Sequence, residues 1–280
     1  MREITCEAIR ELVEKLCVEA ATVLPDDLCR SIVSAQRIEV SPVGQGILQD
    51  IVDNFRLAKE KGVPICQDTG MAVVFLEMGQ EVHITGGSLR EAVNQGVRNG
   101  YLNGKLRCSV VGDPLRRVNT DDNTPAVLHV EIVEGDGFRV TVAPKGFGSE
   151  NMSAMKMFTP AATRENIEDW IASCVDAAGS NPCPPVIVGV GIGGTIEQCA
   201  LEAKKALLSP MDSPNPDPYY ADMEEKTLEK INCLGIGPQG MGGRVTALGV
   251  HIRPTATHIA GLPCVVNMSC HVTRHAVGTL

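Results

Sequence analysis

The segment from Val127 to Val142, VLHVEIVEGDGFRVTV, carries the clearest signal for the fold. Two runs rich in β-branched residues, 127–133 and 138–142, flank the turn sequence Glu134-Gly135-Asp136-Gly137. An Asp-Gly pair between two such runs is typical of a β-hairpin, whose strands are antiparallel neighbours. We therefore expect antiparallel pairing here, rather than the parallel pairing of a repeating β-α-β chain.

Helical patterns lie on both sides of this segment. Apolar residues at helical spacing, with turn residues at the ends, predict helices at 4–24, 26–36, 44–61, 88–103, 195–208 and 219–233. The stretch 151–177 is also expected to be mostly helical, with an interruption near Pro160. Further strands are expected at 71–77, 185–189 and 245–252. This mixture predicts an α+β fold, with mixed or antiparallel sheets flanked by helices.

Composition excludes several classes of function. The chain of 280 residues is 44% apolar, so we expect one folded domain over residues 1–280, which could be arranged as two lobes. A net charge of −9 argues against nucleic acid and anionic membranes as partners. Aromatic residues make up only 3%, which argues against a surface that stacks nucleobases. A small anionic substrate would therefore need a few well-placed Arg, Lys or backbone N–H groups.

The expected location is the cytoplasm. The first residues, MREITCEAIRELVEKL, include no unbroken apolar region of a signal peptide, and no run of 18 apolar residues occurs that could span a membrane. The 11 cysteines are odd in number and include no C-x-x-C pair. That pattern argues against a disulfide framework, a zinc ribbon and a local ferredoxin loop. Any metal cofactor must take its ligands from distant parts of the chain.

Two glycine-rich stretches match G-x-G-x-x-G. The first, Gly189–Gly194, follows a short strand and precedes a helix, as a dinucleotide site requires. The helix after it, however, runs into the proline-rich loop SPMDSPNPDP instead of a strand that ends in an acid. The second, Gly235–Gly240, follows a helix and precedes a strand, so it is interpreted as a loop. A nicotinamide-dependent oxidoreductase that uses the first stretch is kept as a distant alternative.

Three short segments combine residues of unusual chemistry. In 64–70, PICQDTG, Cys66 lies beside an amide, a carboxylate and a hydroxyl on an expected turn. In 181–185, NPCPP, prolines stiffen the backbone on both sides of Cys183. In 267–271, NMSCH, Cys270 precedes a histidine near the end of the chain. A buried thiol is as good an interpretation for each cysteine alone, because only the fold could bring together residues so far apart.

The order of these motifs resembles a known family. ICQDTG, KGFGSEN, CPPVIVGVGIGGT and the final SC are similar to the iron–sulfur-binding region of class I fumarases and L-tartrate dehydratases. The resemblance covers nearly the whole chain and implies the fold of the class I fumarase N-terminal domain. That family divides its catalytic part into an alpha and a beta portion, which are fused or separate. This sequence looks like a separate alpha subunit, in which residues 1–280 form one cluster-binding catalytic domain.

The resemblance implies a [4Fe–4S] cluster with one open iron. Cys66, Cys183 and Cys270 match its three thiolate ligands, whereas Cys264 lies outside the matching motif. Three protein ligands for four irons leave one iron free to bind a substrate oxygen as a Lewis acid. A cluster with four cysteine ligands would instead suit electron transfer.

The resemblance also implies the residues that handle substrate. Gln67 and Asp68 match a catalytic pair that also contacts substrate, Arg107 matches an arginine that binds a substrate carboxylate, and Gly148 matches a glycine whose backbone contacts substrate. His258 matches a catalytic histidine that could be supplied across a dimer interface. The sequence departs from the fused fumarases at Gly146-Phe147-Gly148, where they carry three glycines, and between His258 and Cys270.

The implied function is that of an iron–sulfur-dependent hydro-lyase that hydrates fumarate to L-malate together with a beta subunit. Fumarate is favoured because it is the commoner metabolite, through the tricarboxylic acid cycle. The substrate pair of an L-tartrate dehydratase is the first alternative, and a non-catalytic iron–sulfur subunit is another. The expected assembly is a dimer of heterodimers.

Overall fold

The computed structural model of the chain describes residues 2–280, whose backbone divides into two units. Unit 1 comprises Met1–Pro25, Phe55–Phe147 and Arg274–Leu280. Unit 2 comprises Asp26–Asn54 and Gly148–Thr273. The chain passes from one unit to the other four times: after Pro25, within helix α3 (Pro42–Lys61), within the short helix α5 (Phe147–Glu150) and after Thr273. Each unit is built on its own sheet.

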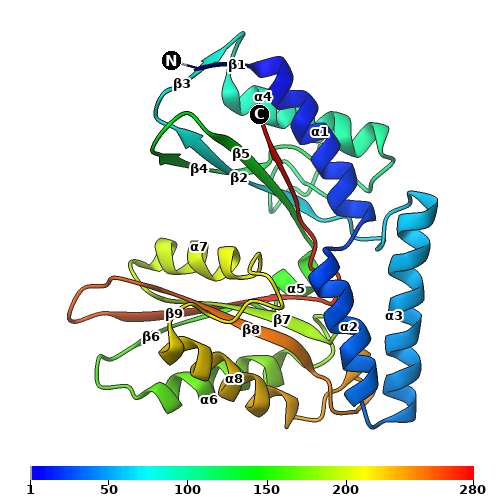
Figure 1. Ribbon diagram of the computed structural model, residues 1–280, viewed down its shortest axis with the longest axis vertical. Helices are drawn as coiled ribbons and strands as arrows, with labels where there is room; N and C mark the ends of the chain where they lie inside the picture. Colours follow the sequence, from blue (N-terminus) through cyan, green and yellow to red (C-terminus); the bar gives the residue numbers. More distant parts are fainter. Residues whose placement is uncertain (1) are drawn as a thin grey trace. The chain divides into compact units, whose positions relative to one another are not determined.

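Unit 1 holds a four-stranded mixed sheet in the order β10-β5-β2-β4. Its elements in chain order are β1 (Arg2–Thr5), α1 (Cys6–Thr22), β2 (Met71–Gly79), β3 (Val82–Thr85), α4 (Leu89–Asn103), β4 (Val127–Val133), β5 (Phe138–Lys145) and β10 (Ala276–Thr279). Strands β1 and β3 form a separate parallel pair. Helices α1 and α4 lie side by side near the sheet (Figure 1).

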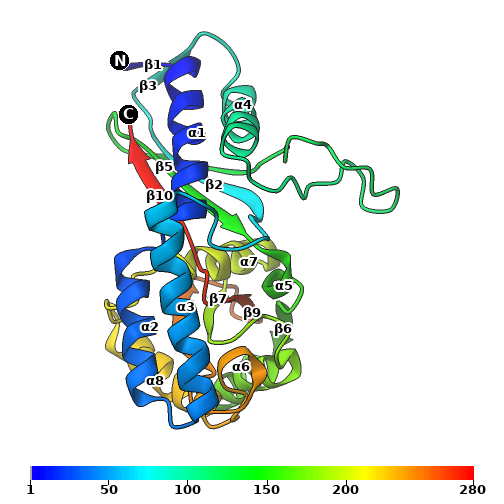
Figure 2. The same ribbon diagram turned by 90° about the vertical axis from the view of Figure 1, so that its right-hand side faces the viewer.

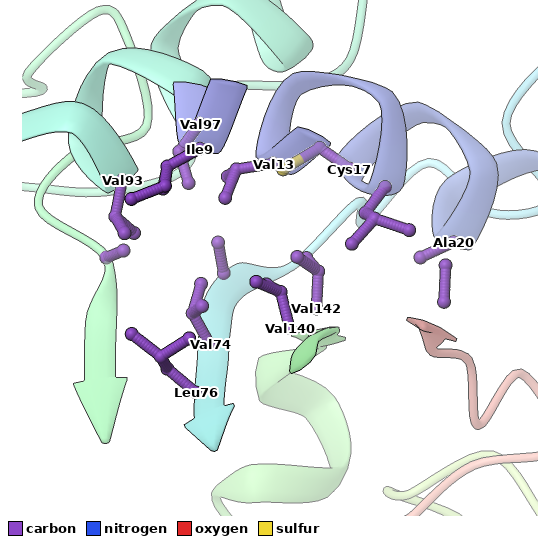
Figure 3. Close-up of a cluster of buried hydrophobic side chains, with 14 of the residues drawn as sticks. Ile9, Val13, Cys17, Ala20, Val74, Leu76, Val93, Val97, Val140 and Val142 are labelled. Carbon is purple, nitrogen blue, oxygen red and sulfur yellow. The ribbon is translucent and has the colours of Figure 1, made fainter. Parts of the chain in front are cut away.

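The core of unit 1 lies between α1, α4 and this sheet. The Thr5 side chain caps α1 by accepting a hydrogen bond from the Ala8 backbone N–H at 3.2 Å. Beyond this cap, apolar side chains at helical spacing form one buried face of α1, and they meet the side chains of β2, β5 and α4 (Figure 3). The labelled members of this core are Ile9, Val13, Cys17, Ala20, Val74, Leu76, Val93, Val97, Val140 and Val142.

The hairpin predicted over 127–142 is wrong in its pairing, although both strands exist. Strand β2 lies between β4 and β5, parallel to β4 and antiparallel to β5. The turn between β4 and β5 instead binds the end of β2, since the Gly79 N–H donates to the Gly137 carbonyl at 2.7 Å and the Glu81 N–H donates to the Gly135 carbonyl at 3.1 Å. The Asp-Gly sequence does form a turn between β4 and β5. The largely buried strand β2 nevertheless lies between them in the sheet.

Unit 2 holds a second four-stranded sheet in the order β6-β9-β7-β8. Its elements in chain order are α2 (Asp26–Ile38), β6 (Ala154–Phe158), α6 (Arg164–Ala178), β7 (Val186–Gly193), α7 (Ile196–Ala206), α8 (Pro218–Asn232), the 3₁₀ turn η1 (Pro238–Gly240), β8 (Ala247–Thr255) and β9 (Leu262–Ser269). Helix α7 covers one face of the sheet, and α6 and α8 cover the other (Figure 1). The central strand β7 is buried at every position.

The observed mixture of helices and mixed sheets confirms the predicted fold class. The mostly helical prediction for 151–177 is wrong in its first part, where β6 pairs with β9. This edge strand is largely exposed, so the alternation that marks a half-buried strand is absent. The strands β1, β3, β9 and β10 were not predicted. Within residues 2–280, no helix is both long enough and apolar enough to cross a membrane.

The first glycine-rich stretch serves packing within unit 2. Gly189 and Gly191 lie inside β7, rather than in a loop before a helix. A Cβ atom on Gly191 would lie 2.1 Å from the Cys199 carbonyl oxygen, and one on Gly189 would lie 2.3 Å from the Ala203 carbonyl oxygen. Glycine at these positions therefore lets the backbone of α7 approach β7 closely.

We expect Gly191→Ala to lower the free energy of unfolding by about 2–3 kcal/mol, because the added methyl group overpacks the contact with α7. Gly46→Ala is the matched control, since a Cβ atom there meets nothing within 4 Å and alanine favours the helix. Urea unfolding followed by circular dichroism measures both. Equal stability of Gly191→Ala and the control would contradict the packing role.

Candidate active site

The motif PICQDTG forms a tight turn between α3 and β2 in unit 1. Gly70 has a φ of +77°, and a Cβ atom there would lie 2.8 Å from the Lys145 backbone nitrogen, so only glycine fits. Ile65 is buried and its N–H donates to the Ala21 carbonyl at 3.0 Å, which fixes the start of the turn. Cys66 is half-buried and Gln67 is exposed. The turn therefore presents its polar residues on a backbone held at both ends.

Three backbone carbonyls of this turn accept hydrogen bonds from buried side chains. The hydroxyl of Tyr101, on α4, donates to the carbonyls of Thr69 at 2.8 Å and Gly70 at 3.0 Å. The Asn123 side-chain amide also donates to the Gly70 carbonyl, at 3.1 Å. The Arg274 guanidinium donates to the Asp68 carbonyl. Buried carbonyls need such partners, so these donors fix the shape of the turn.

The Asp68 carboxylate also holds the turn, through hydrogen bonds from two backbone N–H groups. Its Oδ1 accepts from the Gly70 N–H at 3.0 Å, and its Oδ2 accepts from the Phe147 N–H at 3.0 Å. The carboxylate thus joins the turn to the KGFGSEN motif just before Gly148. In this structure both oxygens of Asp68, which was predicted to be catalytic, bind backbone N–H groups.

Arg107 lies beside the same turn. Its carbonyl accepts a hydrogen bond from the Thr69 hydroxyl at 2.9 Å, while the residue as a whole is exposed. Arg107 begins the long segment between α4 and β4, which runs out from α4 (Figure 2). The structure therefore places the backbone of Arg107 beside the turn that carries Cys66, Gln67 and Asp68.

The other two motif cysteines meet at one end of the sheet in unit 2. Cys183 lies three residues before the start of β7, and Cys270 follows the last residue of β9. Strands β7 and β9 are antiparallel, with Ile187 opposite Ser269, so the start of one lies beside the end of the other. Topology thus brings together two cysteine-bearing segments whose cysteines are 87 residues apart in the sequence.

His271 and Gln239, which were not predicted as site residues, link these two segments. The Nδ1 atom of His271 lies 3.1 Å from the Cys183 carbonyl and 3.3 Å from the Gln239 amide nitrogen. That amide also donates to the Pro184 carbonyl at 2.8 Å. Burial lowers the pKa of His271, although its hydrogen bond with the Cys183 backbone opposes the shift. Because a carbonyl oxygen can only accept, the short distance to Cys183 fits a ring whose Nδ1–H donates to that carbonyl.

The backbone is strained at this end of the sheet. Cys183 has a φ of 56° and Gln239 a φ of 53°, values that side chains other than glycine rarely adopt. Such strain costs about 1–3 kcal/mol per residue and concentrates at functional sites. The second glycine-rich stretch, interpreted from sequence as a loop, therefore also carries a residue that holds the Cys183 segment.

A buried carboxylate anchors the residues that follow this loop. Glu39 is only 2% exposed and accepts four backbone N–H groups, from Val40, Ser41, Arg244 and Val245, at 2.8–2.9 Å. Burial alone would raise the pKa of Glu39, but these hydrogen bonds lower it below its ordinary value of 4.5. Glu39 thereby fixes the chain just after Gln239.

His258 lies at the opposite end of the unit 2 sheet from Cys183 and Cys270. It belongs to the exposed turn between β8 and β9, and its Nδ1 accepts from the Ala260 N–H at 3.1 Å. Since β7 has eight residues, at about 3.3 Å each, the two ends of the sheet are separated by about 25 Å. Within one chain, the structure does not bring His258 to these cysteines.

Gly148 begins unit 2 in the exposed part of α5. A Cβ atom there would meet only the Asn181 carbonyl, at 3.6 Å, so no steric need explains this glycine. The next motif residue, Glu150, accepts from the Lys204 ammonium at 2.6 Å and from the Asn267 amide at 2.8 Å. Glu150 therefore holds the KGFGSEN motif against α7 and β9.

The eleven cysteines differ sharply in their surroundings. Cys17, Cys199 and Cys264 are fully buried. Burial raises the pKa of Cys17 to about 12 and that of Cys199 to about 11, and it also raises the pKa of Cys264, so these thiols do not become thiolates easily. Cys17 belongs to the core of unit 1, whereas Cys6 and Cys29 are half-buried.

Cys66, Cys183 and Cys270 instead lie on turns outside the hydrophobic cores. The Val272 N–H donates to the Cys270 sulfur at 3.4 Å, and hydrogen bonds of this kind tune the reduction potential of a bound cluster. In the described part of the chain, residues 2–280, no three His, Cys, Asp or Glu side chains gather around a single metal ion. Cysteine thiolates are the usual protein ligands of iron–sulfur clusters. Cys66 belongs to unit 1, and Cys183 and Cys270 belong to unit 2.

Comparison with known proteins agrees with these motifs. Residues 10–279 match the family described as Fumarate hydratase (Fumerase). The chain is 38% identical over 275 residues to "Putative L(+)-tartrate dehydratase subunit alpha" of Methanocaldococcus jannaschii, covering 96% of each chain. It is 31% identical over 276 residues to L(+)-tartrate dehydratase subunit alpha of Escherichia coli O157:H7, covering 97% of this chain and 90% of that one.

Together the fold, the motif cysteines and these matches define a subunit of a hydro-lyase. The chain belongs to the fumarate hydratase family. The predicted family and reaction class are confirmed.

We expect Glu39→Gln to lower the free energy of unfolding by about 2–3 kcal/mol at pH 7, because hydrogen bonds to a charged acceptor are lost. The pKa of Glu39 is lowered in the folded chain, so this stability is present above pH 4.5 and is lost as the pH falls toward the folded pKa. The difference between variant and wild type should therefore shrink below pH 4.5. Urea unfolding at several pH values measures it.

Glu60→Gln is the control for this comparison, because the Glu60 side chain is 71% exposed and pairs with the neighbouring Lys61. Its effect should stay within about 0.5 kcal/mol at every pH. A constant difference between Glu39→Gln and wild type across the whole pH range would show that the Glu39 carboxylate is not the group responsible.

Proposed function

We propose that the chain is the cluster-binding alpha subunit of a two-subunit hydro-lyase that hydrates fumarate to L-malate reversibly. The meeting of Cys183 and Cys270 at one end of the β7–β9 pair carries the proposal, together with the presentation of Cys66 on a turn fixed by buried donors. These three thiolates would be the protein ligands of a [4Fe–4S] cluster. When bound, such a cluster supplies a Lewis acid that helps a hydroxyl group to leave.

The chain's own residues would bind and orient the dicarboxylate. Arg107 would hold one carboxylate with its planar guanidinium, because its backbone is tied to the turn at Thr69. Gln67, which is exposed beside Cys66, would donate a hydrogen bond to the substrate, and Gly148 would offer its backbone. Asp68 would hold the turn through its carboxylate and contact substrate only if one of its two N–H partners is released.

The partner chain would supply the missing half of the reaction. Both similar proteins are named as alpha subunits, which supports a separate beta subunit. In this proposal the beta subunit carries the base that takes the proton from C3. His258, which lies at the far end of its own sheet, would act in the site of a second copy, so that the assembly is a dimer of heterodimers. The cytoplasmic location stays a prediction.

L(+)-tartrate is the second candidate substrate. The names of the similar proteins support it, as the family name supports fumarate. Both substrates are 2-hydroxy dicarboxylates or their dehydrated products, so the same carboxylate-binding groups would serve either. The ratio of kcat/KM for L-malate dehydration to that for L(+)-tartrate dehydration, measured with the same assembled enzyme, decides between them.

We expect Cys183→Ser to lose most of the iron and sulfide taken up in anaerobic reconstitution, because one of three protein ligands is removed. Malate formation from fumarate, assayed after the beta subunit is added, should fall by at least about 100-fold. Cys233→Ser is the matched control, since Cys233 is also exposed but lies outside the motifs. A Cys183→Ser enzyme with full iron content and unchanged activity would refute the cluster assignment.

A further inference from the structure

Arg274 is a buried arginine that no motif singled out. It lies four residues after Cys270 and two before β10, and only 4% of it is exposed. One end of its guanidinium, Nη2, donates to the Asp68 carbonyl on the Cys66–Gly70 turn. Burial raises the pKa of the neighbouring Tyr101, and the positive charge of Arg274 opposes this shift. Arg274 and Tyr101 therefore share the buried space behind the turn.

The remaining donors of Arg274 have no acceptor. Its Nε and Nη1 atoms are buried without a hydrogen-bond partner, and among residues 2–280 no carboxylate lies within ion-pair distance of the guanidinium. Other partly buried arginines are paired: Arg98 contacts Asp122 at 2.7 Å, and Arg164 contacts Glu168 at 2.6 Å. A buried charge without a counter-ion destabilises a fold, so stability alone does not explain Arg274.

We propose that Arg274 is a positioning residue of the hydro-lyase, which holds the Cys66–Gly70 turn by its Asp68 carbonyl and keeps a positive charge beside it for the anions bound there. This inference rests on the proposed function, because that function puts anions at the turn. A cluster with three thiolate ligands and a dicarboxylate both carry negative charge. Groups behind a ligand-bearing segment commonly orient the ligand and tune the site.

Arg274→Met and Arg274→Lys test the inference in the full chain. Methionine removes the charge at similar length, and lysine keeps the charge without the planar donor group. Arg139→Met is the control, since Arg139 lies on β5 in the same unit with a side chain that is 52% exposed. Four quantities are measured: the Tm of the cluster-free chain, the iron and sulfide content and the reduction potential after reconstitution, and kcat and KM with the beta subunit.

The Tm of cluster-free Arg274→Met should stay close to that of wild type, because the removal of an unpaired buried charge offsets the loss of the hydrogen bond to the Asp68 carbonyl. Its kcat should fall by at least about 10-fold and the reduction potential of its cluster should become more negative, while Arg274→Lys lies between Arg274→Met and wild type. Arg139→Met should match wild type throughout. Nearly unchanged stability together with lower activity is the signature of a functional residue.

A large drop in Tm, or loss of folding, in Arg274→Met would overturn the inference, because it would show that Arg274 serves mainly to stabilise the fold. Unchanged kcat, KM and reduction potential in a wild-type assembly that is itself active would also overturn it and leave the proposed function standing. If wild type turned over neither fumarate nor L(+)-tartrate, the proposed function would fail. The Tm comparison of the cluster-free chains would still show whether the charge of Arg274 destabilises the fold.

Discussion

The structure around the proposed site depends on one constraint, which is that the buried backbone carbonyls of the Cys66–Gly70 turn must have hydrogen-bond donors. Tyr101 comes from α4, Asn123 from the end of the long segment before β4, and Arg274 from the chain just before β10. These donors are far apart in the sequence. The packing of α1 and α4 on the sheet, and the return of the chain end as β10, are what bring them to a single turn.

In unit 2, the order of the strands fixes where the two cysteine segments lie. The antiparallel pairing of β7 and β9 places Cys183 and Cys270 at the same end, and His271, Gln239 and Glu39 then hold their segments. A rigid frame suits an open-iron cluster, because the ligands must hold the metal while one position is left for substrate. The same topology puts His258 at the other end of the sheet.

The sequence could predict what depends on local pattern. Helical spacing located α1, α2, α3, α4, α7 and α8, and the apolar runs located β2, β4, β5, β7 and β8. It could not predict that β2 separates β4 from β5, because strand order depends on the burial of both faces. The motif order indicated the three cysteines and Arg107. Tyr101, Asn123, Gln239 and Arg274 were missed, since single polar residues reveal their role only when the fold supplies a buried carbonyl beside them.

The central claim is that this chain holds a cluster with three protein ligands and one iron that is open to substrate. Mössbauer spectroscopy of the chain reconstituted anaerobically with ⁵⁷Fe and assembled with a beta subunit tests it most directly. One iron in four should show distinct parameters that change when L-malate or L(+)-tartrate is added, while the other three stay unchanged. Four irons that respond alike, or none that respond to either acid, would contradict the claim.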